Sequence, residues 1–201
     1  MAAPPPLILA SRSPARQAVL RAAGIDFEVE PAEVDEAAVK AALKAEGAGP
    51  DDAARALAEL KAIRVSNRWP GALALAGDQI LAAGDRWYDK PADLAQAAAQ
   101  LRALRGTEHV LHTVLAIARD GGVIWRHGER PRLTLRDFSD EFLDRYLALE
   151  GPAVLESVGG YRLEGRGSQL FSRIEGDHFA ILGLPLMPLL AFLRGHQVVA
   201  S

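Results

Sequence analysis

Apolar residues along the chain form short strand-like runs that alternate with helical stripes, and this pattern indicates an α/β fold. Apolar runs predict strands at residues 7–10, 27–30, 73–81, 109–119, 123–125, 133–136 and 170–174. Apolar positions with helical spacing predict helices at about 15–23, 37–46, 51–67, 94–104, 140–149 and 187–194. No internal repeat or linker interrupts the series, so residues 1–201 are expected to form a single domain.

The stretch at 73–81 stands out because it is apolar on both sides of a single acid, Asp78. Residues 73–76 and 80–81 predict a buried strand with a break at Gly77. Asp78 is then expected at or just past the edge of the core. A carboxylate in that position needs a metal ion, a cation or several hydrogen bonds.

Two lysines accompany this acid along the chain. Lys61 lies on the edge of the apolar stripe of the helix at 51–67, one turn after Leu57. A lysine there usually extends to solvent, although it could instead point into a cleft. Lys90 is held in an Asp-Lys-Pro turn. An acid between two lysines suits a phosphate ligand with a divalent ion, whereas each residue alone is more simply a surface charge or a turn.

The first strand leads directly into a polar turn and a helix start. Ser13 is a good N-cap and Pro14 occupies the first helical position. Free backbone N–H groups at such a helix start form an anion site, and Arg12 and Arg16 stand beside it. The alternative is a well-capped helix with two solvated arginines.

An acidic segment follows, in which Glu33, Asp35 and Glu36 place three carboxylates within four residues. Acids favour the first turn of a helix, so capping is the preferred interpretation. The same carboxylates could instead be ligands for a hard divalent cation.

Composition narrows the function classes. The 201 residues carry a net charge of −3 without a long basic run, so a broad nucleic-acid surface is not expected. The absence of cysteine excludes disulfides, thiolate catalysis and cysteine-ligated zinc. The five histidines lack metal-binding spacing. No apolar run is long enough to span a membrane, and residues 1–6 do not read as a secretory signal, so a cytoplasmic protein is expected.

Taken together, the ordered motifs resemble the Maf proteins, a family of nucleoside triphosphate pyrophosphatases also named for septum formation inhibition. Each piece is weak alone, but the ordered set is specific and spans nearly the whole chain. The matching stretches are LILASRSPAR at 7–16, AEVDE at 32–36, LAELKA at 57–62, GDQ at 77–79, KP at 90–91, LRGTEH at 104–109, YRLEG at 161–165, IEGD at 174–177 and GLPL at 183–186.

This resemblance implies an α/β fold with an elongated mixed β-sheet flanked by helices, and two lobes around a deep cleft. It implies hydrolysis of a nucleoside triphosphate at its α–β bond, giving the monophosphate and pyrophosphate, with Mg²⁺ or Mn²⁺ as cofactor. It leaves a homodimer open. The implied site residues are Asp78 as base or metal ligand, Lys61 and Lys90 as catalytic cations, Ser11, Ser13 and Arg16 as substrate ligands, and Glu33 as a second metal ligand.

Three positions bear on the preferred base. Members that act on dTTP and UTP tend to have arginine, threonine and glutamine where this chain has Ala15, Gln79 and Glu164. Gln79 and Glu164 resemble the subgroup that hydrolyses 7-methyl-GTP, whereas Ala15 departs from it. We expect these three positions to set specificity, with Gln79 and Glu164 contacting the base. A nucleotide-binding regulator of cell division without turnover is the alternative from another class.

Overall fold

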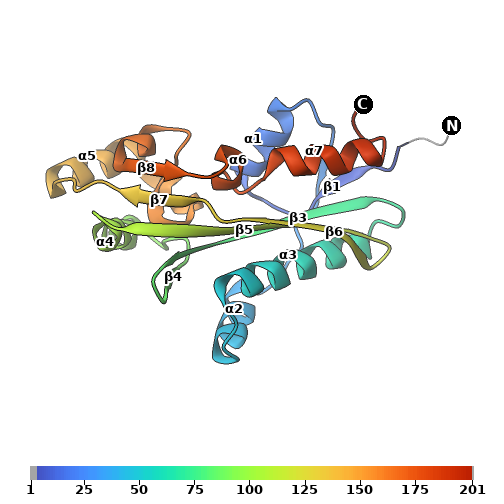
Figure 1. The fold of residues 1–201 in the computed structure, drawn as a ribbon, viewed down its shortest axis with the longest axis horizontal. Coiled ribbons are helices and arrows are strands. Elements are labelled where there is room, and N and C mark those ends of the chain that lie inside the picture. Colours follow the sequence, from blue (N-terminus) through green and yellow to red (C-terminus); the bar gives the residue numbers. More distant parts are fainter. Residues whose placement is uncertain (1–3, 201) are drawn as a thin grey trace. The chain divides into compact units, whose positions relative to one another are not determined.

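In the computed structural model, residues 4–200 are described, and they form an α/β fold (Figure 1). The strands are β1 (Leu7–Leu9), β2 (Glu28–Val29), β3 (Leu73–Ala83), β4 (Arg86–Tyr88), β5 (Glu108–Arg119), β6 (Gly122–Glu129), β7 (Arg132–Leu135) and β8 (Phe171–Glu175). The α-helices are α1 (Pro14–Ala22), α2 (Glu36–Ala45), α3 (Pro50–Ser66), α4 (Leu94–Leu104), α5 (Asp140–Glu150), α6 (His178–Ile181) and α7 (Leu186–Gly195). Three 3-10 helices are η1 (Gly151–Glu156), η2 (Val158–Gly160) and η3 (Arg166–Leu170).

The described strands form one eight-stranded mixed sheet, which confirms the predicted fold class. Its main path is β2-β1-β3-β5-β7-β8, with β4 beside β3 and β6 beside β5. Strand β1 is parallel to β2 and β3, and its register with β3 runs from Leu7 opposite Leu73 to Leu9 opposite Leu75. The pairs β3–β4, β5–β6, β5–β7 and β7–β8 are antiparallel.

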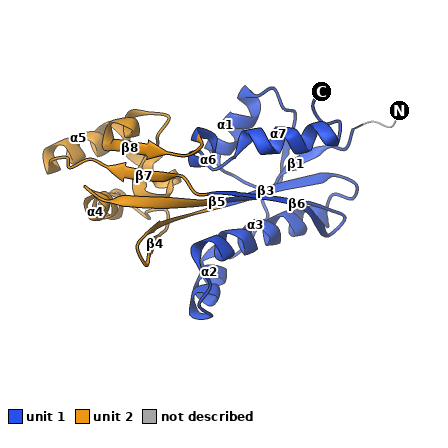
Figure 2. Ribbon diagram, in the orientation of Figure 1, with its two compact units in different colours: residues 1–78, 113–129, 178–201 blue, residues 79–112, 130–177 orange. Residues whose placement is uncertain are grey.

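The chain divides into two compact units (Figure 2). The first unit comprises Met1–Asp78, Thr113–Glu129 and His178–Ser201, and the second comprises Gln79–His112 and Arg130–Asp177. Strands β3 and β5 therefore each contribute residues to both units. The single domain and the deep cleft expected from the sequence stay predictions.

In the first unit, helices cover both faces of the sheet, with α1, α6 and α7 on one face and α2 and α3 on the other (Figure 1). The face under α1 and α7 holds a leucine-rich core that includes Leu9, Leu75, Leu115 and Leu189. The opposite helix α3 buries mainly small side chains, among them Ala54, Ala58 and Ala62. Because these side chains are short, the α3 backbone can lie close to what it packs against.

In the second unit, α4 and α5 pack against each other and against η1. A buried aromatic cluster lies nearby, in which His109 Nε2 and the Tyr161 hydroxyl are hydrogen-bonded at 2.8 Å and Phe171 packs against both rings. Burial lowers the pKa of His109 to about 4 and raises the pKa of Tyr161. Both groups are therefore neutral at physiological pH.

Most predicted elements are present, and the differences have physical causes. The helix predicted at 94–104 matches α4, and Asp120 and Gly121 form the hairpin turn between β5 and β6 with φ of 50° and 81°. The predicted break at Gly77 is wrong, because β3 continues through it to Ala83. The glycine-rich segment at 159–167 includes parts of η2 and η3.

Within residues 4–200, no helix combines the length and the apolar character needed to cross a membrane. Residues 1–3 belong to the segment that argued against a secretory signal, and they lie outside the described part of the chain.

Candidate active site

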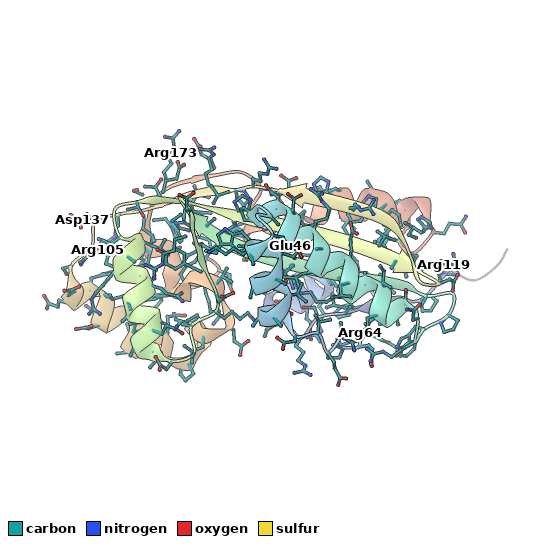
Figure 3. All side chains as sticks on the ribbon, turned by 90° about the horizontal axis from the view of Figure 1, so that it is seen from below. Glu46, Arg64, Arg105, Arg119, Asp137 and Arg173 are labelled. Carbon is teal, nitrogen blue, oxygen red and sulfur yellow. The ribbon has the colours of Figure 1, made fainter. Side chains whose placement is uncertain are left out.

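A lysine and an aspartate form a buried ion pair in the first unit. Lys61 Nζ on α3 lies 2.6 Å from Asp78 Oδ1 on β3, and the two residues are only 6% and 4% exposed. Charged groups are seldom so buried unless they are paired. Other charged side chains, such as Arg64, Arg119 and Arg173 (Figure 3), are exposed. The structure thus brings together two predicted catalytic residues that are 17 positions apart in the sequence.

The second carboxylate oxygen of Asp78 is the most informative atom of this pair. Asp78 Oδ2 is buried and makes no hydrogen bond with any residue from 4 to 200. Leaving such an acceptor unsatisfied costs roughly 1–3 kcal/mol, so its presence in a folded protein calls for an explanation. A water proton or a cation that arrives with a ligand would satisfy it.

Glu36, one of the three carboxylates of the acidic segment, is a further member of the cluster. Its Oε1 lies 3.1 Å from Lys61 Nζ, so Lys61 bridges two carboxylates. Burial raises the pKa of Glu36, but Lys61, Lys40 and Arg16 together outweigh this effect and the net pKa is lowered. The capping prediction for the acidic segment is confirmed, because Asp35 caps α2 by accepting from Ala38 N at 3.0 Å.

Arg16 is fixed by two hydrogen bonds within the first unit. Its Nε donates to the Gly183 carbonyl at 2.8 Å, and its Nη1 donates to Ser11 Oγ at 3.2 Å. Burial lowers the pKa of the Arg16 guanidinium, while the charges of Asp78 and Glu36 oppose this shift. An arginine side chain stays protonated in proteins, so Arg16 is a permanent cation near the two carboxylates.

The turn before α1 is organised by its two serines. Ser13 Oγ accepts from Arg16 N at 3.4 Å, and Ser11 Oγ accepts from Ser13 N at 3.2 Å. In these bonds each hydroxyl acts as an acceptor, so its own O–H can still donate. Pro14 begins the nine-residue helix α1, and Ala15 follows it. Hydroxyl donors, the positive end of a helix and Arg16 together suit an anion.

The sheet topology brings this turn to Asp78. Strand β1 is parallel to β3, but its register with β3 ends at Leu75, and Ala10 N donates to the Leu75 carbonyl. The segment 77–78 of β3 therefore extends beyond the carboxyl end of β1, where the turn with Ser11 begins. Open α/β sheets bind their ligands at the carboxyl ends of parallel strands.

The predicted metal ligand Glu33 lies elsewhere in the first unit. Its side chain is exposed, its φ is 49°, and its carbonyl accepts from Arg64. Among the described residues, no group of three or more His, Cys, Asp or Glu side chains could hold a metal ion. Asp78 and Glu36 nevertheless offer hard oxygen donors, and Mg²⁺ typically uses one or two carboxylates together with substrate phosphates. The donor set therefore fits a cation that binds with a polyphosphate.

Three other predicted residues belong to the second unit. Gln79 is partly buried on β3 and follows Asp78, so the two side chains leave the strand on opposite faces. Lys90 is exposed, and its Nζ lies 3.9 Å from Glu156 Oε2. Glu164 is exposed and accepts from Arg162 Nε at 3.2 Å. The functional roles of these three residues stay predictions.

Comparison with known proteins gives similarity over almost the whole chain. A family model for Maf-like proteins matches residues 6–196. A nucleoside triphosphate pyrophosphatase from Granulibacter bethesdensis is 53% identical over 193 residues, covering 96% of this chain and 98% of that protein. A 7-methyl-GTP pyrophosphatase from Rhizobium etli is 50% identical over 190 residues, covering 94% and 96%. A nucleoside triphosphate pyrophosphatase from Paramagnetospirillum magneticum is 54% identical over 187 residues, covering 93% and 96%.

Proposed function

The chain belongs to the Maf family, and from that membership we propose that it is a nucleoside triphosphate pyrophosphatase. It hydrolyses the α–β phosphoanhydride bond and releases the nucleoside monophosphate and pyrophosphate. The observation that carries this proposal is the Asp78 carboxylate, in which Lys61 holds Oδ1 and leaves the buried Oδ2 without a described partner. A site that only bound a triphosphate would lose affinity by placing such a carboxylate against it.

Substrate binding depends on donors around the start of α1. A triphosphate carries about four negative charges, and charge-assisted bonds to its oxygens are stronger than neutral ones. Arg16, the hydroxyls of Ser11 and Ser13, and the positive end of α1 would hold one phosphate group. The hydrogen bonds from Arg16 to Ser11 and Gly183 support this role, because they fix the guanidinium before substrate binds.

Hydrolysis then needs an activated water. Asp78 Oδ2 accepts a proton from this water, whose oxygen bonds to a phosphorus flanking the α–β bridge. The bond from phosphorus to the bridging oxygen breaks, and its electron pair leaves with the other phosphate fragment. Lys61 keeps Asp78 in place and stabilises charge on the phosphates, and Lys90 is proposed to act on the same charge. Binding a metal is the alternative role for Asp78.

A divalent cation, Mg²⁺ or Mn²⁺, is the proposed cofactor. Glu36 would hold it, joined by Asp78 Oδ2 in the alternative in which Asp78 binds the metal and is not the base. When bound, it would neutralise phosphate charge and make the phosphorus a better target for water. Glu33 remains the sequence-based candidate for a further metal ligand. Measuring Mn²⁺ binding to the Glu36→Gln and Glu33→Gln variants in the presence of a nucleotide analogue tests this, because only loss in Glu36→Gln matches the cluster that the structure describes.

The proposed preferred substrate is 7-methyl-GTP. A relative named 7-methyl-GTP pyrophosphatase is 50% identical to this chain. Gln79 and Glu164 offer an amide and a carboxylate for a purine edge. A carboxylate suits the N–H donors of guanine and the cationic ring of its 7-methyl form. Exchanging Glu164 for glutamine should then weaken 7-methyl-GTP use by roughly 1–3 kcal/mol relative to GTP. Unchanged selectivity would remove Glu164 from this role, and a preference for dTTP or UTP would favour the other subgroup.

The deciding experiment is a substrate panel that measures pyrophosphate and phosphate separately. Purified protein with Mg²⁺ or Mn²⁺ would receive 7-methyl-GTP, GTP, dTTP, UTP, CTP and ITP. We expect pyrophosphate release, and we expect the Asp78→Asn variant to lose it by about 10²- to 10⁴-fold while still binding nucleotide. No turnover of any substrate by the intact protein, together with retained binding, would favour a nucleotide-sensing regulator. Phosphate as the sole product would indicate cleavage of a different bond.

Some finer expectations stay part of this proposal. We propose that residues 1–201 act as one domain, that the protein works in the cytoplasm where nucleoside triphosphates are abundant, and that it does not use nucleic acid as a partner. A homodimer is part of the same proposal. Cell fractionation and light scattering of the purified protein test the location and the oligomeric state directly.

A further inference from the structure

Two glycines lie directly against the guanidinium group of Arg16, and they come from distant parts of the chain. Gly77 is the residue before Asp78 on β3, and Gly183 follows α6. Both contact the same end of the Arg16 side chain, which suggests that they have one task in common. All these residues belong to the first unit.

Gly77 is needed for space and not for its backbone conformation. It is not among the described glycines with positive φ, so alanine could adopt its backbone angles. A Cβ atom at this position, however, would lie 2.8 Å from Leu115 Cδ2 and 3.1 Å from Arg16 Nε. Both neighbours are ends of side chains, but Leu115 is fully buried in the core and Arg16 is held by two hydrogen bonds. An alanine at position 77 therefore has to displace both Leu115 and the Arg16 guanidinium by a few tenths of an ångström.

Gly183 approaches the same guanidinium and also binds it. Its carbonyl accepts from Arg16 Nε at 2.8 Å, and a Cβ atom here would lie 3.3 Å from both Nε and Nη2. Its φ of +83° is in the left-handed region that favours glycine. An alanine at this position would thus press on Arg16 and strain the backbone at the same time.

The hydrogen bonds of Arg16 leave one part of its guanidinium available. Nε is used by Gly183 and Nη1 contacts Ser11, whereas Nη2 makes no hydrogen bond with a described residue. Arg16 is only partly buried as a residue. A planar guanidinium held at one edge can present its remaining N–H groups to phosphate oxygens in a fixed orientation.

We propose that Gly77 and Gly183 are positioning residues that fix the Arg16 guanidinium for the triphosphate of the substrate. This inference rests on the proposed function, because it assumes that Arg16 binds a phosphate. A misplacement of about 1 Å can cost on the order of 100-fold in rate, so displacing Arg16 by a few tenths of an ångström should still be measurable.

The test compares two alanine variants with two matched glycine controls. Gly77→Ala is matched by Gly195→Ala, and Gly183→Ala by Gly24→Ala, which has φ of +68°. A Cβ atom at either control position would meet nothing within 4 Å. Calorimetry would measure affinity for inorganic tripolyphosphate. We expect Gly77→Ala and Gly183→Ala to bind about tenfold more weakly and the controls to stay within twofold of the intact protein.

A double-mutant cycle separates positioning from a general structural effect. In an Arg16→Lys background, the planar group is gone, so Gly77→Ala should weaken tripolyphosphate binding by less than twofold further. If Gly77 acted only on the fold, its effect would be the same in both backgrounds. In steady-state assays, Gly77→Ala should raise KM about tenfold and leave the pH profile of kcat unchanged, because the atoms nearest to the added methyl group belong to Leu115 and Arg16.

The outcomes separate this inference from the proposed function. If the unchanged protein hydrolyses no nucleotide but both alanine variants bind tripolyphosphate more weakly, the proposed enzymatic function is contradicted and the positioning role is supported. Hydrolysis by the intact protein, with binding by both variants equal to that of their controls, would overturn the positioning role alone. Tripolyphosphate that does not bind the intact protein at all would also overturn it.

Discussion

Two lysines that look equally suited to a phosphate site lie in very different surroundings. Lys61, in the first unit, is buried with its ammonium 2.6 Å from Asp78. Lys90, in the second unit, has a side chain that is 53% exposed, and its ammonium lies 3.9 Å from the exposed carboxylate of Glu156. Exposed pairs are screened by water and are worth 0–1 kcal/mol, whereas a buried pair fixes both side chains.

Burial therefore decides which of the two lysine charges is held permanently in place. Asp78 and Lys61 must stay together, because either one alone would be an uncompensated charge in the core. Lys90 can exchange Glu156 for another anion at little cost. The first lysine suits a preformed part of a site, and the second suits a group that responds to a ligand.

The largest expected effect breaks the buried pair. Replacing Lys61 with methionine leaves Asp78 buried without its cation, so the free energy of unfolding should fall by about 3–5 kcal/mol at pH 7. Urea denaturation measures this loss. The Lys61→Met/Asp78→Asn double variant is the control and should regain part of the stability, and a loss below 1 kcal/mol in Lys61→Met would contradict the argument.

A buried group in the second unit tests whether burial, and not the unit, is decisive. His109 is 1% exposed, and burial lowers its pKa to about 4 from an ordinary 6.5. Between these two pH values the unfolded chain binds more protons than the folded protein. The contribution of His109 to the free energy of unfolding is therefore complete above pH 6.5 and is lost as pH falls toward 4. Between pH 7 and pH 5 this amounts to about 2 kcal/mol.

The His109→Gln variant provides the comparison, because glutamine does not titrate and can still reach the Tyr161 hydroxyl. Urea denaturation at both pH values should show a smaller loss on acidification in the variant than in the intact protein, by about 2 kcal/mol. Equal losses would mean that His109 is accessible to protons in the folded protein.

An intermediate effect is expected for the second carboxylate on Lys61. The Glu36 side chain is 47% exposed, so its bond to Lys61 at 3.1 Å is partly screened. Replacing Glu36 with glutamine should lower the free energy of unfolding at pH 7 by about 1 kcal/mol. Because the Glu36 pKa is lowered in the folded state, its contribution is present above the ordinary value of 4.5 and is lost as pH falls through the folded value. Thermal melts at pH 7 and pH 3.5 measure the loss of stability and its dependence on pH. If Glu36→Gln lost as much stability as Lys61→Met, burial of the partner carboxylate would not decide the strength of its pair with Lys61.

The smallest expected effect belongs to the exposed pair. Replacing Lys90 with methionine should change the free energy of unfolding by less than about 0.5 kcal/mol, because water already screens its attraction to Glu156. If Lys90 acts on the substrate, the loss of turnover, expressed as a free energy of activation, should be clearly larger than the change in the free energy of unfolding. A substantial loss of stability would show that exposure does not predict the worth of this pair.

The sequence could predict features that depend on neighbouring residues, but not contacts between distant ones. Local signals were sufficient for helix α1, where Ser13 accepts from Arg16 N, and helical spacing was sufficient for α4 and α5. The short elements β4 and α6 were missed, since three or four residues carry too little periodicity. The helical stripe placed Lys61 at the edge of the buried face, but it could not show which residue 17 positions away would meet it.

Gly77 and Glu36 show why part of the site could not be predicted. A glycine inside an apolar run usually signals a bend, and Gly77 was interpreted in that way. Its actual reason is the packing of Arg16 and Leu115, which are distant in sequence. Glu36 follows the capping residue Asp35 and looked like an ordinary first-turn acid, because its contact with Lys61 depends on how α2 meets α3.

Gly77 and Asp78 are neighbours on β3, and their positions alternate between the two faces of the strand. Position 77 accommodates Arg16 and position 78 carries the acid. Which face of the strand a residue lies on therefore depends only on whether its position is odd or even. Over evolutionary time β3 can therefore change by substitution, one residue at a time. An inserted or deleted codon just before Gly77 would exchange the two faces at once, so lineages of this protein should show length variation in their loops and almost none in this strand.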